Sequence, residues 1–513
     1  MSAAQARLTE EDEFAMAQDE FAQMIDFLRS RQSRELSHAE LEVALNERGR
    51  ELLRVLFQAH VDSRGPGPAA APVCGADGVE RNQRRLHERG LSTLFGEVRV
   101  KRLGYGAAGV ASLHPLDAEL NLPAGEYSLG VRRLAAEQAA QVSFEATVQA
   151  LAQQTGKTMG KRQVEELVQR SAVDFDAFYA RRSPAAEVAS SSILALSADG
   201  KGVVMLPRDL REPTRKAAQG RAHKLAKRLS KGEKRNRKRM ATVAAVYTVA
   251  PFERTPEQVA RCLAPLHEPA PARPPVEHKR VWASLEKTTE EVLEEAFREG
   301  LRRDPGRHKT WVGLVDGNAT QLELLEALRA KHKVELTIVL DVIHVSEYLW
   351  DASVAFNQEA SPQREQWVGE RLHNVLRGNA AQVAAGMRRS ATLRGLSAKQ
   401  RKPVDAAARY LLNHQQYMRY DRYLAAGLPI GTGVIEGACR HLVCDRMDGV
   451  ARWSLNGAEA VLRLRALRSS GDFAQYWSFH LAQEYQRNHV TRYADGNVAS
   501  VQGHSRPHLR RVK

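Results

Sequence analysis

The chain has 513 residues, of which 43% are apolar, so two or three domains with substantial cores are expected. Its net charge of +15 favours an anionic partner such as nucleic acid. The sequence has no long apolar run and begins with acidic residues, which argues against a membrane-spanning helix or a secretory signal. Four cysteines without Cys-x-x-Cys spacing indicate neither a zinc ribbon nor a disulfide framework. We therefore expect a cytoplasmic protein with access to DNA and no membrane partner.

Residues 1–62 carry apolar side chains at helical spacing, which predicts a helical N-terminal region with a role in dimerisation. Residues 63–127 are interpreted as a linker rich in Gly and Pro, followed by a small β region. The β region is indicated by residues 94–105, where apolar and polar residues alternate.

Residues 128–189 are predicted to be helical and to bind DNA. Two helical stretches within them flank a turn at residues 155–160, which is the outline of a helix-turn-helix. Its second helix would present Lys161 and Arg162 to DNA. A helical hairpin with a purely structural role has the same pattern and remains the alternative.

From residue 190 onward the pattern changes to short apolar strands separated by helices. Residues 200–202 are read as a turn between the first two strands. The predicted strands are 192–198, 203–206, 241–252, 311–315 and 334–340, and the predicted helices are 281–298, 321–331 and 342–356.

This order of elements matches a mixed five-stranded, RNase H-like sheet. The predicted fold class is therefore α/β, with a helical insertion in the core and a mostly helical DNA-binding region before it. The core is assigned to residues 190–344 and, as C-terminal helices, to residues 429–487, and residues 345–428 are the insertion. Residues 488–513 are basic and poor in apolar residues, so a flexible tail is expected.

Three acidic residues stand where such a fold gathers its functional groups. Asp199 and Asp316 directly follow apolar strands, and Glu436 lies at the start of a helix after Gly431 and Gly433. Each has a structural alternative, as a turn former, a helix cap or a charge that complements the helix dipole. The first and fourth strands of an RNase H-like sheet are neighbours, so their aspartates can share a metal. Two Mg²⁺ ions held by such acids can drive phosphoryl transfer.

Asp341 and His344 form a second candidate pair at the end of the fifth strand. Three residues apart on a helix, they share a face. They are candidate extra ligands, a proton relay or a hydrogen-bonded pair that orients the site. Asp341 is also an alternative to Asp316 as the second catalytic acid.

A block of positive charge interrupts the strand region. Residues 201–240 hold 15 Lys and Arg against 3 acidic residues, a net charge of +12. Such a run is often a solvated loop, but here it accompanies acids that need a phosphate substrate, so contact with the DNA backbone is predicted. The predicted DNA-binding residues of this block are Lys201, Arg208, Arg211, Arg215, Lys224, Lys227, Arg228, Lys234, Arg235, Arg237 and Lys238.

A third group follows Glu436 in the segment 445–453. Arg446 and Arg452 are predicted to contact DNA, and Trp453 is a candidate for stacking on an unpaired base. A tryptophan in the hydrophobic core is the alternative for Trp453.

The chain resembles bacterial DDE transposases of the ISKra type, which are related to the ISLre type and to the Mutator-like superfamily. The resemblance covers about 400 residues, and its motifs are specific in combination. These motifs are Leu94-Phe-Gly-Glu-Val, Ser-Ala-Asp199-Gly-Lys-Gly, Val-Asp316-Gly-Asn, Leu-Asp341-Val-Ile-His344-Val-Ser-Glu-Tyr-Leu-Trp350, the segment 427–437 and the segment 445–453.

The resemblance implies an RNase H-like core with Asp199, Asp316 and Glu436 as the metal-binding acids, and it relates Asp341 and His344 to a family motif. The predicted function is metal-dependent cleavage of the ends of an insertion sequence and strand transfer into target DNA. Mg²⁺, or Mn²⁺ in its place, is the expected cofactor, double-stranded DNA the partner and a homo-oligomer the assembly. Two alternatives remain, namely a nuclease that cuts without joining and an inactive transposase-derived DNA-binding protein.

Overall fold

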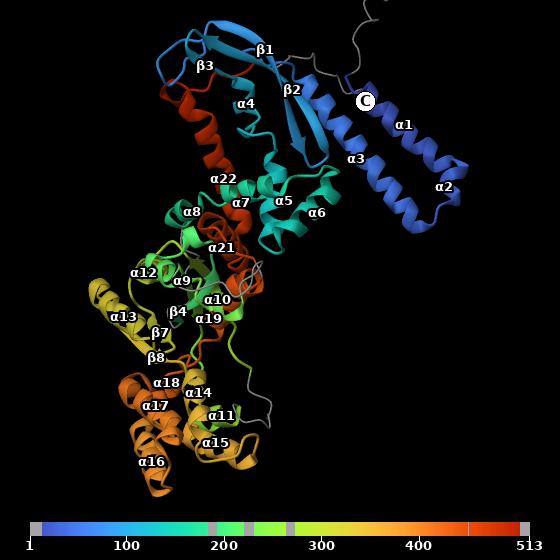
Figure 1. Cartoon of the computed structure of the whole chain (residues 1–513). Helices are drawn as coiled ribbons and strands as arrows, with labels where there is room; N and C mark the ends of the chain where they lie inside the picture. The colour runs from blue at the N-terminus through green and yellow to red at the C-terminus, as the bar shows by residue number, and fades with distance from the viewer. Residues whose placement is uncertain (1–12, 183–191, 220–229, 263–271, 450, 503–513) are drawn as a thin grey trace, which may run out of the picture. The chain divides into compact units, whose positions relative to one another are not determined.

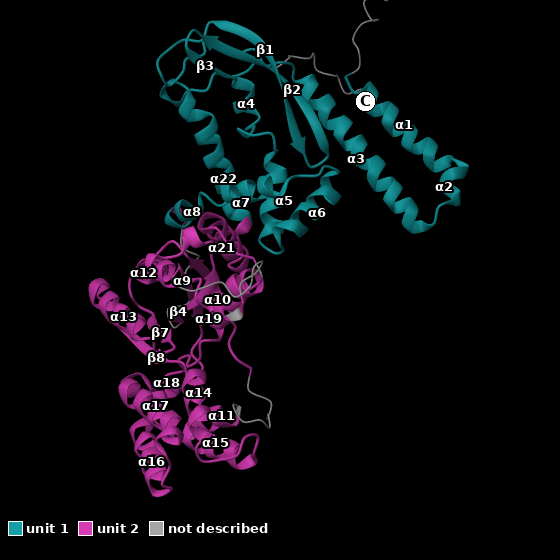
Figure 2. Ribbon diagram, in the orientation of Figure 1, with its two compact units in different colours: residues 1–180, 474–513 teal, residues 181–473 magenta. Residues whose placement is uncertain are grey.

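The computed structural model describes residues 13–182, 192–219, 230–262, 272–449 and 451–502, and it is shown in Figure 1. The chain divides into two compact units, coloured separately in Figure 2. Unit 1 combines residues 1–180 with residues 474–513, and unit 2 comprises residues 181–473. The C-terminal helix that we assigned to the catalytic core therefore belongs to the same unit as the N-terminal region.

Unit 1 is mostly helical, as predicted, and contains one small antiparallel sheet of order β1-β2-β3. Helix α3 begins with a capping box between Ser37 and Glu40. The elements are α1 (Ala15–Arg29), α2 (Arg31–Glu35), α3 (His38–Ser63), β1 (Gln83–Thr93), β2 (Gly96–Ala107), β3 (Val110–Leu113), α4 (Pro115–Glu119), α5 (Leu129–Ala139), α6 (Phe144–Thr155), α7 (Lys161–Ser171), α8 (Phe175–Arg181) and α22 (Phe473–Asn488).

Helix α22 is joined to the earlier part of unit 1 by hydrogen-bonded polar and charged side chains, most of them buried. The Asp174 carboxylate accepts hydrogen bonds from His480 at 2.7 Å and from Arg487 at 2.7 and 2.8 Å. Arg132 donates to Glu484 at 2.9 Å, and both side chains are buried. Because buried charges need partners, these pairs tie the two parts of unit 1 together.

The prediction of a flexible tail from residue 488 is wrong for residues 488–502. Ala69 bridges to Val501, and the amide of Gln502 donates to the carbonyl of Pro68. The segment that we read as a linker is thus paired with the tail, because each supplies backbone hydrogen-bonding groups that the other satisfies. Residues 503–513 lie outside the described part of the chain.

Unit 2 is built on a mixed five-stranded sheet of order β6-β5-β4-β7-β8. Strands β4, β7 and β8 are parallel, whereas β5 is antiparallel to both β4 and β6. Residues 193–198 are all buried, as expected for a strand covered on both faces. The strands are β4 (Ile193–Val204), β5 (Lys238–Val249), β6 (Glu277–Ser284), β7 (Thr310–Val315) and β8 (Leu336–Leu340). The predicted α/β class and the mixed five-stranded sheet are confirmed.

The predicted strands differ from the observed ones in two details. The predicted turn at residues 200–202 does not exist, because β4 continues to Val204 and pairs with β5 along its whole length. Residues 203–206 are therefore not a separate strand. The third strand in chain order is β6, part of which we had assigned to a helix starting at residue 281.

Helices account for most of the remainder of unit 2, including most of the predicted insertion. Helix α12 begins with a capping box between Thr288 and Glu291. The helices are α9 (Glu212–Gln219), α10 (Lys231–Arg235), α11 (Pro256–Cys262), α12 (Thr289–Arg303), α13 (Ala319–His332), α14 (Val342–Ser353), α15 (Pro362–Leu376), α16 (Ala380–Leu393), α17 (Ala398–His414), α18 (Tyr420–Ala425), α19 (Gly433–Ala438), a π-helical turn (Cys439–Cys444), α20 (Asp445–Met447) and α21 (Leu455–Ser469). Among the described residues, no helix is both long and apolar enough to cross a membrane.

Candidate functional site

The three candidate aspartates lie at the same level on three neighbouring strands. The last β4–β7 pair is Ser197 with Leu314, so Asp199 and Asp316 each stand two residues beyond it. The last β7–β8 pair is Val315 with Leu340, so Asp316 and Asp341 each stand one residue beyond that pair. The amide of Asp341 donates to the carbonyl of Val315 at 2.8 Å. Adjacent strands are about 5 Å apart, so the three aspartates form one row across β4, β7 and β8. The sheet register thus brings together the aspartates that the sequence singled out.

Asp199 is held by groups on β4 and on the π-helical turn. Its carboxylate accepts from the amide of Gly200 at 2.6 Å and from the Cys439 thiol at 3.2 Å. Lys201 forms an ion pair with it at 3.1 Å. Burial and the Asp199 carboxylate raise the pKa of the Cys439 thiol, which keeps it protonated as a donor. Burial opposes the charge of Lys201, but the same carboxylate outweighs it, so the pKa of Lys201 is raised.

Asp341 is connected to Glu436 through Thr432. Asp341 is 3% exposed and accepts the Thr432 hydroxyl at 2.6 Å. The same hydroxyl lies 3.4 Å from Glu436 Oε1. Glu436 is exposed in the first turn of α19, as predicted from the sequence. One buried hydroxyl therefore links a member of the aspartate row to the candidate glutamate.

Thr432, Glu436 and Cys439 share one face of a single helical segment. They are spaced four and three residues apart, which places them on successive turns of the same side. Thr432 bonds to Asp341 at one end of the row, and Cys439 bonds to Asp199 at the other. We did not single out Thr432 or Cys439 from the sequence, although their spacing from Glu436 was a usable signal.

Asp316 is fixed chiefly through its backbone. Its carbonyl accepts from the Tyr410 hydroxyl at 2.8 Å, and its carboxylate accepts from the amide of Asn318 at 2.9 Å. The intervening Gly317 has φ +91, and a Cβ there would meet the Tyr410 hydroxyl oxygen at 2.9 Å. Glycine is needed at this turn both for its conformation and for the close approach of Tyr410.

Asp341 and His344 do not bond to each other among the interactions that the structure describes. His344 Nδ1 contacts Glu347 at 3.0 Å, and its ring lies edge-on to Tyr348 and Tyr410. Asp341 is instead the N-cap of α14, accepting from the amide of Ile343 at 3.1 Å. The interpretation of the two residues as a mutually hydrogen-bonded pair is therefore not supported.

The acids are close in backbone position but do not converge. In the part of the chain that the structure describes, no group of three or more His, Cys, Asp or Glu side chains is arranged to hold a metal ion. The physical reason lies in their present partners, because Asp199 is turned to Lys201 and Cys439 while Asp341 is turned to Thr432. The donors themselves are carboxylate oxygens, which suit a hard divalent cation.

The predicted DNA-binding block is only partly described. Lys224, Lys227 and Arg228 lie outside the described residues. Arg208, Arg211 and Arg235 are exposed. Several residues of the block already have protein partners. Arg208 lies 3.5 Å from Asp209, Lys201 pairs with Asp199, Lys234 donates to the carbonyl of Gly449 at 3.3 Å, and Lys238 lies 4.0 Å from Asp448. Arg215 and Arg237 are half-buried.

Trp453 is part of the core of unit 2. It is 5% exposed, its backbone pairs with residues 204–206 beside β4, and the Arg446 guanidinium lies over its ring at 4.7 Å. Burial lowers the pKa of Arg446 to about 10. The structure favours the core interpretation of Trp453 over base stacking, whereas Arg452 is exposed.

The predicted helix-turn-helix elements are present as α6 and α7 in unit 1. Lys161 and Arg162 begin α7 and are exposed, with Arg162 paired to Glu166 at 3.2 Å. Their side chains are accessible to a partner, and their contact with DNA stays a prediction.

Replacing Thr432 by valine is expected to lower the free energy of unfolding by about 1–3 kcal/mol, because the buried Asp341 carboxylate loses its hydroxyl donor. Serine at the same position should retain nearly full stability. The check is urea denaturation of the full chain, with Thr310→Val, at an exposed position on β7, as the matched control. Equal stability of the valine and wild-type proteins would contradict the role of this hydroxyl.

The fold and the site define an α/β protein with a row of acids at one edge of a mixed sheet. The sequence matches no protein-family model and has no match among curated proteins.

Proposed function

We propose that this chain is a DDE-type DNA transposase that cleaves the ends of an insertion sequence and transfers them into target DNA. The observation that carries the proposal is the acidic row of Asp199, Asp316 and Asp341 on β4, β7 and β8, joined to Glu436 through Thr432. Asp316 and Asp341 directly follow the carboxyl ends of β7 and β8, a common location for a functional site in α/β sheets, and Asp199 lies beside them within β4.

The sheet supports an RNase H-like core as the fold behind this function. Three successive strands, β4, β5 and β6, run antiparallel; β7 then adds in parallel beside β4, and β8 in parallel beside β7. Helices α12, α13 and α14 follow β6, β7 and β8 in turn. The helices α15 to α18, between Asp341 and Glu436, occupy the place of the insertion that the resemblance to ISKra-type transposases implies.

Asp199, Asp316 and Glu436 are the proposed ligands of Mg²⁺ or Mn²⁺, with Asp341 as the alternative second acid. Carboxylate oxygens are the ligands that such a cation prefers, and the backbone brings these residues near one another. Their side chains would have to rotate to converge on one ion. When bound, a pair of such ions would supply charge stabilisation for phosphoryl transfer.

The protein's own groups provide binding and orientation in this proposal. Thr432 holds Asp341 next to Glu436, and Cys439 holds Asp199 from the opposite end of the same helical face. Lys201 forms an ion pair with Asp199 and balances its charge. The exposed arginines of the basic block, such as Arg208 and Arg211, would contact phosphates of the substrate.

The proposed partner is double-stranded DNA, including both element ends and the target. Joining two ends to one target calls for at least two copies of the site, so a homo-oligomer associated with DNA is part of the proposal. Affinity for DNA should fall steeply with salt concentration, because phosphate contacts release counterions.

The decisive experiment incubates the full chain and Mg²⁺ or Mn²⁺ with end-labelled duplexes taken from the DNA that flanks the coding sequence, together with a supercoiled target plasmid. We expect labelled strands to be cut and then joined covalently to the plasmid. Cutting without joining would replace the proposal by the nuclease alternative. Binding of the duplexes without any cutting would replace it by the inactive DNA-binding alternative.

A further inference from the structure

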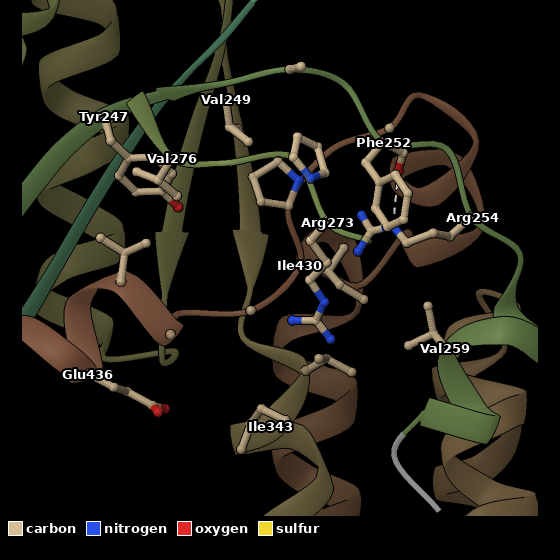
Figure 3. Close-up of a pocket in the computed structure, with 18 of the residues that line it drawn as sticks. Tyr247, Val249, Phe252, Arg254, Val259, Arg273, Val276, Ile343, Ile430 and Glu436 are labelled. Carbon is tan, nitrogen blue, oxygen red and sulfur yellow. Dashed lines mark hydrogen bonds between the residues drawn. The ribbon is translucent and has the colours of Figure 1, made fainter. Parts of the chain in front are cut away.

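A largely apolar cavity of about 390 Å³ opens beside the candidate acids in unit 2 (Figure 3). Its apolar walls come from the end of β5 and the segments near it, chiefly Tyr247, Val249, Phe252, Val276 and Ile430. Its volume lies within the range of pockets that bind small organic ligands, about 300–1,000 Å³. A single flat ring system fits this space, whereas a helical duplex does not.

Two arginines add positive charge to these walls. The Arg254 guanidinium lies over the Phe252 ring at 5.1 Å and donates to the carbonyls of Phe252 and Leu428, so its position is fixed. Arg273 is exposed and, within the described residues, makes no ion pair or hydrogen bond. Figure 3 shows both arginines with Phe252 and Ile430 at the same part of the cavity. The occupant is therefore expected to combine an apolar body with an anionic group.

The position of the cavity narrows the identity of that occupant. Glu436, Gly431 and Gly433 line one side of it, and these residues flank Thr432, which bonds to Asp341. A ligand in the cavity would thus lie next to the proposed site of phosphodiester cleavage. The glycines leave this wall without side chains and allow a close approach of the ligand.

We propose that this cavity binds one unpaired nucleotide of the DNA substrate, with its base against the apolar walls and its phosphate at Arg273. This inference rests on the proposed function, because it requires DNA at the neighbouring acids. Extrusion of a base costs unstacking energy, which contact with aromatic and apolar side chains and an arginine repays. Such a pocket would hold the strand in register at the point of cleavage.

The test compares equilibrium binding of a labelled oligothymidylate with that of an abasic strand of the same length and charge. The wild-type full chain should bind the base-bearing strand about tenfold more tightly. Val276→Trp, at a lining position that is 40% exposed, should narrow the cavity and reduce this preference to about twofold. Val354→Trp, at a position that is 59% exposed and outside the cavity, should leave the preference unchanged.

Arg273→Ala provides a second measurement that does not depend on filling the cavity. It should weaken binding of both strands, because both carry phosphates, and Arg389→Ala on the exposed face of α16 is its control. A wild-type protein without preference for bases would overturn the proposal, as would a preference that survives Val276→Trp. Because binding is measured without cleavage, the pocket and the strand-transfer activity can fail separately.

Discussion

Replacement of Asp199 by alanine is expected to reduce DNA cleavage by about a thousandfold or more. A carboxylate that binds catalytic metal contributes several kcal/mol to transition-state stabilisation, and each 1.36 kcal/mol changes the rate tenfold. The measurement is the cleavage rate of the labelled duplex by the full chain. Asp351→Ala is the matched control, because Asp351 is exposed on α14 away from the acidic row.

The same assay separates Asp316 from Asp341. Both extend the register of the sheet, so asparagine variants, which keep much of the hydrogen bonding, are the sharper comparison. The second catalytic acid should lose as much activity as Asp199 when it becomes asparagine, and the other should retain a measurable rate. An Asp199→Ala protein with wild-type activity would remove the acidic row from catalysis altogether.

Replacement of Glu299 by alanine is expected to lower the free energy of unfolding by about 3–5 kcal/mol. Glu299 is 8% exposed and pairs with Arg280 at 2.6 Å, Arg302 at 2.7 Å and Arg303 at 2.7 Å. Removal of the carboxylate leaves buried guanidinium groups without their counter-charge. Denaturant unfolding measures the loss, and Glu290→Ala, at an exposed position on the same helix, should change stability little.

The Glu299 cluster also predicts sensitivity to acid. Burial opposes the charge of Glu299, but Arg280 and Arg303 outweigh it and lower the pKa of its carboxyl from 4.5 to about 2. Since this folded value is below the unfolded one, the stabilisation is complete above pH 4.5 and is lost as the pH falls towards 2. The Glu299→Ala variant should therefore show a flatter decline of stability over this interval, and an unchanged decline would contradict the assignment.

The sequence predicted the order of the sheet better than the ends of its strands. Asp199 was expected at a strand end because Gly200 follows it, yet pairing with β5 carries β4 on to Val204. Strand β6 was missed because its first half, from Glu277, is polar and its second half precedes a strong helix signal. Its Arg280 is buried only because Glu299 on α12 lies opposite, a partner that the local sequence does not reveal.

The acids of the candidate site could be predicted from the sequence, but the residues that hydrogen-bond to them could not. Strand-end patterns and a Gly-rich approach marked all four carboxylates. Thr432 and Cys439 acquire their roles only when α19 lies against the sheet and its face meets Asp341 and Asp199. The cavity is still harder to foresee, since its walls come from residues as distant in sequence as Tyr247 and Ile430.

The split composition of unit 1 has a consequence for how the protein is made. A ribosome completes residues 1–180 and then all of unit 2 before it reaches α22. Until that moment Asp174 has neither His480 nor Arg487, and Arg132 lacks Glu484. Unit 2 is a continuous segment of the chain, whereas unit 1 is completed only when α22 follows unit 2. The N-terminal part of unit 1 therefore lacks these buried partners until α22 has been synthesised.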